Sequence, residues 1–257
     1  MYFDSHAHLT DPGLVDELEE ILKRAADAGI TGILSASVDL GTSRKNLEIG
    51  RAHKSTVFAA VGVHPELAGM VTPGWEEELE ELIEKGAPVA VGEIGLDAHH
   101  PNPPLEVQIP VFRAQVRLAS RHRLPLVLHS RKAALEVLRI VEEEGATGAG
   151  GVFHCLEADE VFARAAVNAG FHVGICGNVT YPRNEVLRAI AGRLPRERIL
   201  VETDCPYLAP QPIRGKRNEP AHLVHTAAVV AAAMGVGAEE CGRITEANAK
   251  ALFRIRP

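Results

Sequence analysis

Apolar runs of strand length alternate with amphipathic, helix-like segments from one end of this chain to the other. The runs predict eight strands, at residues 3–8, 32–38, 57–63, 89–96, 124–128, 151–153, 171–175 and 199–203. The segments between and after them predict helices, at residues 15–28, 46–53, 75–85, 105–122, 133–144, 159–169, 185–191, 221–234 and 239–253. Glycines at positions 29, 86 and 145 end three of these helices.

Eight strand–helix units in a chain of 257 residues are typical of a (β/α)8 TIM barrel, an α/β fold. A doubly wound open sheet is the alternative, but it usually carries a glycine-rich phosphate turn after its first strand. Here the sequence SHAHL at residues 5–9 stands in that place and contains no glycine. No linker, repeat or change of composition divides the chain, so we expect one barrel domain over residues 1–257.

Charge and cysteine content restrict the class of protein. The formal net charge of −7 argues against a broad basic surface that grips nucleic acid, although it leaves room for a local cleft charged by metal ions. The cysteines are far apart and form no Cys-x-x-Cys pair, as expected for reduced thiols of a cytoplasmic protein: Cys155, Cys176, Cys205 and Cys241. With no leader and no apolar run of about 18 residues, we expect no membrane contact.

Two histidines stand at the end of the first predicted strand. Side chains alternate along a strand with a period of two, so His6 and His8 point to the same side. Two imidazoles on one face can hold a transition-metal ion. Isolated histidines are mostly structural, so the interpretation depends on further polar residues at later strand ends.

Such residues recur at the ends of the later predicted strands: His64, Glu93, His129, His154 and Asp204. In a (β/α)8 barrel the C-terminal ends of the strands meet at one face, where the chemistry takes place. A catalytic zinc ion needs only three protein ligands, whereas two ions sharing a carboxylate would use four imidazoles and two carboxylates. Mixed His and carboxylate ligands favour zinc, manganese, iron or cobalt, with magnesium bound through the carboxylates.

Seven ordered motifs across nearly the whole chain resemble the TatD-related metal-dependent hydrolases, amidohydrolase-like barrels that include deoxyribonucleases. The motifs are FDSHAHL at residues 3–9, VGVHPE at 61–66, VGEIGLD at 91–97, LHSRKA at 128–133, FHCLEA at 153–158, VETDCPYLAP at 201–210 and RGKRNEP at 214–220. The resemblance implies two divalent metal ions, zinc, manganese or magnesium, and no organic cofactor.

The resemblance also implies how the metal ions are held. His6, His8 and Asp204 match the ligands of a first ion, and Glu93 matches a carboxylate that bridges both ions. His129 and His154 match the ligands of the second ion.

The same resemblance implies catalytic roles. Asp204 matches the acid/base beside the attacking water, and His64 matches a residue that faces the scissile group. Glu93, as the bridging carboxylate, is counted with them as catalytic. Arg131 and residues 214–218 are placed to meet phosphate or to hold the mouth of the barrel.

The chain departs from the family pattern at two places. The sequence AHHP at residues 98–101 replaces an aromatic residue, and we interpret His99 and His100 as solvated. HCLEA replaces the common HCFSG and brings Glu157, whose charge repels phosphate unless a metal or Arg neutralises it. Cys155 and Cys205 adjoin proposed ligands, but alternation along a strand turns them away, so we expect them to serve packing.

Three functions remain open at this point. The first is a metal-dependent phosphodiesterase that cleaves DNA or RNA from an end, with nucleic acid as substrate. The second is hydrolysis of a carboxylic ester or amide, such as an acyl group on tRNA or a small amide, by the same two-metal site. The third is a non-enzymatic scaffold, which the complete set of six ligands argues against.

Overall fold

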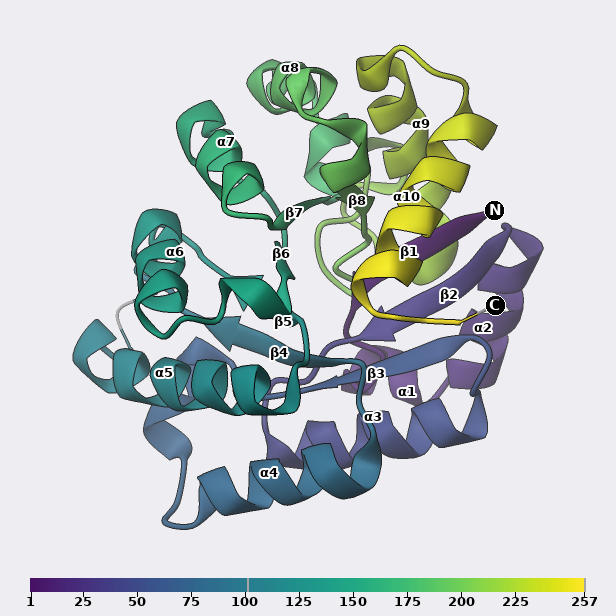
Figure 1. The fold of residues 1–257 in the computed structure, drawn as a ribbon. Coiled ribbons are helices and arrows are strands. Elements are labelled where there is room, and N and C mark those ends of the chain that lie inside the picture. The colour runs from purple at the N-terminus through teal and green to yellow at the C-terminus, as the bar shows by residue number, and fades with distance from the viewer. Residues whose placement is uncertain (101, 257) are drawn as a thin grey trace.

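Eight parallel strands, arranged in chain order, curl into a nearly closed barrel (Figure 1). The computed structural model describes residues 1–100 and 102–256. The strands are β1 (Tyr2–Ala7), β2 (Ile30–Ser35), β3 (Val57–Val61), β4 (Ala90–Gly95), β5 (Leu126–His129), β6 (Gly151–Phe153), β7 (His172–Ile175) and β8 (Ile199–Val201). The predicted (β/α)8 barrel is therefore confirmed.

Helices follow the strands and cover the outside of the barrel (Figure 1). The α-helices are α1 (Pro12–Val15), α2 (Leu18–Asp27), α3 (Leu40–Ala52), α4 (Trp75–Gly86), α5 (Leu105–His122), α6 (Ala134–Glu143), α7 (Glu160–Asn168), α8 (Glu185–Arg193), α9 (Leu223–Met234) and α10 (Ala238–Leu252). Short 3-10 helices are η1 (Pro65–Met70), η2 (Thr147–Ala149), η3 (Gly177–Thr180), η4 (Arg196–Arg198), η5 (Gln211–Ile213) and η6 (Pro220–His222).

The helix predicted over residues 15–28 starts at the wrong residue. The chain forms the short α1 before it, and α2 begins only at Leu18. The Asp11 side chain accepts a hydrogen bond from Gly13 N, and Pro12 occupies the first helical position. An acidic N-cap followed by proline is a strong helix start, so a separate turn of helix forms ahead of the amphipathic segment.

Apolar side chains, from alanine to phenylalanine, fill the barrel interior at the N-terminal ends of the strands. One cluster draws on seven strands and the end of the chain: Phe3, Leu34, Ala60, Ala90, Val127, Val152, Leu200, Ala249 and Phe253. Side chains alternate along a strand, so the next inward position lies two residues further on. At the ends of β5, β6 and β8 this position holds a polar residue: His129, His154 and Glu202. The interior is thus apolar at one end and polar at the other.

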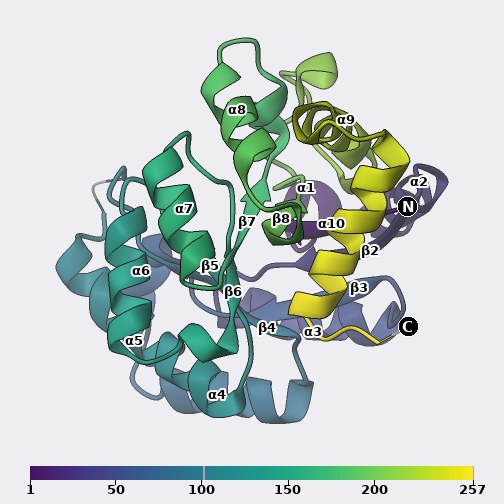
Figure 2. The same ribbon diagram turned by 45° about the horizontal axis from the view of Figure 1, so that its top comes forward.

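The last two helices pack side by side on the barrel, and α10 lies against β1 and β8 (Figure 2). Gly242 in α10 permits this contact, since a Cβ there would lie 2.4 Å from Met1 O. Within the described residues, no single helix has the length and apolar character to cross a membrane; only Pro220–Met234 and Ala238–Leu252 meet that test jointly, as a pair bent by 101°.

The barrel closes where β1 meets the end of β8. Asp4 is fully buried there, and its carboxyl accepts hydrogen bonds from Thr203 N at 2.9 Å and Thr203 Oγ1 at 2.6 Å. Backbone bonds continue the closure, from Asp204 N to His6 O and from His8 N to Cys205 O. Burial raises the pKa of Asp4 to about 8, so the carboxyl is mostly protonated at neutral pH. This seam fixes His6 and His8 beside Asp204.

Candidate metal centre

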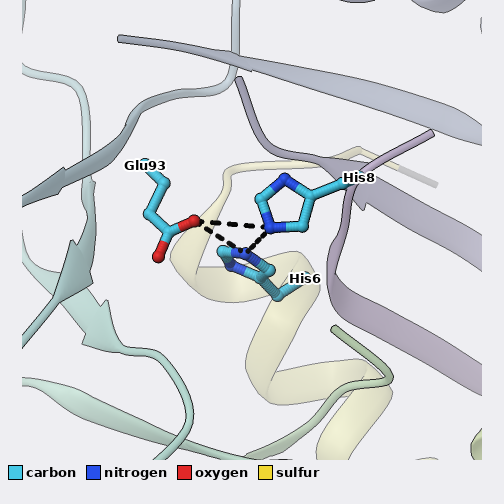
Figure 3. A group of neighbouring side chains, drawn as sticks. All are labelled: His6, His8 and Glu93. Carbon is cyan, nitrogen blue, oxygen red and sulfur yellow. Dashed lines mark hydrogen bonds and ion pairs between the residues drawn. The ribbon is translucent and has the colours of Figure 1, made fainter. Parts of the chain in front are cut away.

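All seven side chains predicted for the site come together at the C-terminal ends of the strands. His6 and Glu93 lie within β1 and β4, and His129 is the last residue of β5. The others follow closely after β1, β3, β6 and β8: His8, His64, His154 and Asp204. Figure 3 shows His6, His8 and Glu93 with their nitrogen and oxygen atoms turned toward one another.

The first donor group consists of His6, His8, Asp204 and one oxygen of Glu93. His6 Nε2 and His8 Nε2 are 3.2 Å apart, and they lie 3.3 and 3.5 Å from Glu93 Oε2 (Figure 3). Asp204 Oδ1 lies 3.7 Å from His6 Nε2 and 3.4 Å from His8 Nε2. Four donor atoms from three strand ends therefore face one small space.

These spacings fit a divalent metal ion. A tetrahedral ion with bonds of about 2.0–2.2 Å holds its ligand atoms about 3.3–3.6 Å apart. The five pairs of donor atoms described above are 3.2–3.7 Å apart. Direct hydrogen bonds between such atoms would normally draw them closer, to about 2.7–3.0 Å. The first donor group is thus spaced for coordination, and neutral imidazole with carboxylate is a donor set that zinc and manganese accept.

The second donor group consists of His129, His154 and the other oxygen of Glu93. Glu93 Oε1 lies 2.7 Å from His129 Nδ1 and 3.1 Å from His154 Nε2. His64 stands beside this group, with its Nε2 3.2 Å from His129 Nδ1 and 3.7 Å from Glu93 Oε1. Each oxygen of the Glu93 carboxylate therefore faces a different donor group, which is the arrangement that a bridging ligand requires.

Glu93 is negatively charged in this environment. Burial alone would raise the pKa of its carboxyl, but the histidines around it lower that pKa well below the usual value: His154, His6, His64 and His129. In turn, although burial disfavours the charged imidazole, Asp97 and Glu93 raise the pKa of His129 to about 9. A proton and a metal ion therefore compete for His129 Nδ1.

Asp97 holds His129 from the side away from Glu93, a role that the sequence analysis missed. Its Oδ2 lies 3.1 Å from His129 Nε2, and its Oδ1 accepts hydrogen bonds from the backbone N–H groups of His99 and His100. A carboxylate behind a metal-binding imidazole fixes the orientation of the ring and its tautomer. Asp97 lies within the VGEIGLD motif, but that motif does not reveal which histidine the side chain contacts.

Glu202 lies behind His154 in the same way and was also missed. Its Oε1 lies 3.3 Å from His154 Nδ1 and accepts a hydrogen bond from Cys155 N at 2.6 Å. Glycine at position 174 leaves room for it, since a Cβ there would lie 2.2 Å from Glu202 Oε2. The available signal was its position directly after β8, two residues before Asp204 in the motif VETDCPYLAP.

A cavity of about 770 Å³ opens over both donor groups. The wall includes Arg131, Glu157 and Tyr207. It also includes Cys155, so the expectation that Cys155 faces away is wrong. The backbone at Cys155 has a φ of 50°, which ends the strand alternation on which that expectation relied. Cys205 is fully buried, as expected.

The segment at residues 214–218 binds other parts of the protein. Arg217 hydrogen-bonds Gly13 O and forms an ion pair with Glu17 at 2.8 Å. Arg214 lies over the Tyr181 ring, 4.4 Å from its centroid. The buried Asn218 amide donates to the carbonyls of Thr203 and Tyr207. The sequence predicted that this segment either meets phosphate or holds the mouth of the barrel. These contacts support the second role.

His99 and His100 are both exposed, as interpreted from the sequence. His100 nevertheless has a defined contact, since its Nδ1 lies 2.9 Å from Asp97 Oδ2 and from Glu66 Oε1. It therefore stands behind Asp97, outside both donor groups. Pro101, the last residue of the AHHP sequence, is outside the described residues.

A barrel of this kind with clustered His and carboxylate donors at its mouth defines the class of metal-dependent hydrolases. The family model described as TatD related DNase matches residues 3–254, and the chain belongs to this family. An uncharacterized metal-dependent hydrolase of Bacillus subtilis, YabD, is 37% identical over 99% of this chain and 100% of its own length.

Two further relatives agree with this assignment. The 3'-5' ssDNA/RNA exonuclease TatD of Erwinia billingiae is 34% identical, over 98% of this chain and 99% of its own. Among solved structures, the TatD homolog YJJV of Escherichia coli superposes with a TM-score of 0.94 at 29% identity, covering 99% of this chain and 98% of that one. The protein is accordingly a metal-dependent hydrolase of the TatD family.

Proposed function

We propose that the protein is a two-metal phosphodiesterase that removes nucleotides from the ends of DNA or RNA. The observation that carries this proposal is the position of Glu93, whose two oxygens face two separate donor groups. The name of the Erwinia relative, a 3'-5' ssDNA/RNA exonuclease, supports nucleic acid as the substrate.

Six residues would hold the two ions. His6, His8 and Asp204 would hold the first, His129 and His154 the second, and Glu93 would bridge them. When bound, such a pair of zinc, manganese or magnesium ions supplies an activated water and stabilises the charge on the attacking and leaving oxygens. The chain's own part is to fix this geometry and to bind and orient the substrate.

Asp204 and His64 would handle the proton and the phosphoryl group. Asp204 Oδ1 faces the first donor group, so this carboxylate can accept the proton of the attacking water. His64 Nδ1 accepts a hydrogen bond from Glu66 N at 3.3 Å, which leaves the proton of a neutral imidazole on Nε2. Burial lowers the pKa of His64 to about 3, so it is neutral and can donate from Nε2 to a phosphoryl oxygen.

An exonuclease assay tests the proposal. Protein stripped with a chelator is reloaded with magnesium, manganese or zinc and given end-labelled single-stranded DNA and RNA. We expect stepwise release of mononucleotides that depends on the metal. Absence of release with every metal, from protein that binds two ions, would rule the nuclease proposal out.

Hydrolysis of a carboxylic ester or amide is the second candidate, because the cavity wall is acidic. Asp11, Glu66 and Glu157 lie in it, against one arginine, Arg131, among the described lining residues. Repulsion between these carboxylates and phosphate would favour a less charged substrate. Rates on a phosphodiester and on a small uncharged ester or amide, measured on one preparation, separate the two candidates.

A further inference from the structure

Tyr207 presents an aromatic ring to the solvent-filled side of the cavity. Tyr207 is 56% exposed. Among the large apolar side chains that are well exposed in the described part of the chain, it is the aromatic one. Single exposed apolar residues are common on proteins, so exposure alone means little. The location is what distinguishes this ring, because it forms part of the wall above the first donor group.

The Tyr207 ring is a direct neighbour of His8, one of the proposed metal ligands. Its centroid lies 5.9 Å from that of His8, with the two rings edge to face at 72°. A nucleotide's base is joined to its phosphate through a single sugar. A phosphate held at the donor groups would therefore bring its own base, or that of the adjoining nucleotide, into the part of the cavity where the ring is exposed.

The backbone that carries Tyr207 is rigidly held. Tyr207 N donates to Asp204 O at 2.9 Å, and the buried Asn218 amide donates to Tyr207 O at 2.7 Å. The ring itself packs edge to face against the His8 ring. A ring fixed in this way loses little conformational entropy when a ligand stacks on it. The turn that positions Asp204 thus also positions an open aromatic face.

The charge of the cavity wall makes contacts with nucleobases, such as stacking on the Tyr207 ring, more important for binding. Apart from histidines, Arg131 is the one basic side chain among the described lining residues, and acidic residues outnumber it. A single arginine can hold few phosphates besides the one at the metal centre. Binding of the other nucleotides must therefore come largely from contacts with their bases. Every base can stack on an aromatic ring.

We propose that Tyr207 is a stacking platform for a nucleobase next to the scissile phosphate, an inference that rests on the proposed nuclease function. It implies a substrate whose terminal bases are unpaired, since a paired and stacked base does not offer its face to the ring. It also implies little preference for sequence and a shallow dependence of affinity on salt, because few phosphates are neutralised by the protein.

Kinetics on two substrates test the inference. One is a single-stranded oligodeoxynucleotide, and the other is the same strand with abasic terminal nucleotides at both ends. With the first, Tyr207→Leu should raise KM about 5- to 150-fold with a smaller effect on kcat. Tyr207→Phe keeps the ring and should recover most of the affinity. On the abasic strand, Tyr207→Leu and the unaltered protein should be equal.

Two results would overturn the inference: an equal loss on both substrates, or no loss on the regular strand. Leu135→Ala, at an exposed apolar residue of α6 away from the cavity, controls for nonspecific effects. If neither strand is cleaved, the nuclease proposal fails and binding decides the inference. Calorimetry on the zinc-loaded protein should then show AMP binding about 5- to 150-fold tighter than ribose 5-phosphate, with this difference lost in Tyr207→Leu. Equal affinities in the unaltered protein would refute the stacking platform.

Discussion

The two donor groups share Glu93 but differ in how their atoms are spaced. In the first donor group the histidine nitrogens lie 3.2–3.7 Å from one another and from the carboxylate oxygens, as ligands of one ion would. In the second, Glu93 Oε1 and His129 Nδ1 are in direct hydrogen-bond contact at 2.7 Å. A proton therefore joins the atoms of the second group, whereas the first group leaves room for an ion.

The groups also differ in what stands behind their imidazoles. His129 and His154 each face a buried carboxylate, Asp97 and Glu202, and the pKa of both histidines is raised. Neither His6 Nδ1 nor His154 Nδ1 has a hydrogen-bond partner among the described residues, but His154 Nδ1 has Glu202 Oε1 at 3.3 Å, and burial lowers the pKa of His6. Both histidines of the second group thus have a raised pKa, whereas in the first group only that of His8 is raised, so protons compete with metal more strongly at the second group. We therefore expect the first ion to bind more tightly.

The largest effect should come from removing the ligand that both groups share. Glu93→Gln keeps the shape of the side chain but removes its charge and one coordinating oxygen. We expect kcat to fall more than about 10³-fold, because one ion loses its ligand from the bridge and the site loses its central charge. Stoichiometry of bound zinc should drop below two while circular dichroism stays unchanged. Surviving activity with two bound ions would contradict the bridging role.

Lowering the pH should have the next largest effect, and it should weaken metal binding at the two donor groups to different extents. The pKa of His129 is about 9, so below that pH a proton must leave before Nδ1 can bind metal. For this proton alone, the affinity for the second ion should fall about tenfold for each pH unit between pH 8 and 6. In the first donor group the pKa of His8 is raised, against the effect of burial, by Asp204 and Glu93, but burial lowers the pKa of His6, so fewer protons compete and the first ion should show a shallower slope. Calorimetry in buffers of different ionisation enthalpy counts the protons released by each ion, and equal counts would refute the distinction.

The carboxylate behind His129 provides a narrower test. Asp97→Asn removes the negative charge but keeps an oxygen for the backbone N–H groups of His99 and His100. We expect the affinity for the second ion to fall about 10- to 100-fold, with the first ion unaffected. Glu66→Gln is a matched control, since Glu66 contacts His100 rather than His129. Competition with a chelator measures both affinities, and a loss confined to the first ion would reverse the assignment.

The smallest effect should follow from loosening the seam between β1 and β8. Asp4→Ala leaves the buried Thr203 N without its acceptor and should lower the free energy of unfolding by about 1–3 kcal/mol. His6 and Asp204 lie on opposite sides of this seam, so the first ion should also bind more weakly. The second donor group lies on β4, β5 and β6 and should be unaffected.

Asn at position 4 is the control for this last test. It resembles the protonated carboxyl that burial favours, because the pKa of Asp4 is about 8. We therefore expect Asp4→Asn to retain most of the stability lost in Asp4→Ala, as measured by urea unfolding. Equal losses in both variants would mean that the hydrogen bonds to Thr203 contribute little.

Much of this fold could be predicted from local pattern. The helix at Leu105–His122 has the bounds that its periodicity predicted, and the strand at Gly151–Phe153 does too. The start of the first helix could not, because Asp11 and Pro12 begin a separate turn that apolar periodicity does not detect. For the site, the strand-end positions of His64, Glu93 and the other predicted residues were visible in the sequence. Asp97 and Glu202 were overlooked because their partners are distant in the chain.

By itself, the sequence determined that eight strand–helix units follow one another and that His and carboxylate side chains stand where the strands end. Both are local properties, set by alternation along a strand and by spacing along a helix. Only the tertiary structure decided that Glu93 turns one oxygen to each donor group, that Asp97 supports His129, and that Arg217 pairs with Glu17. Distances between such atoms depend on how the curled strands and their loops pack, which no short stretch of sequence contains.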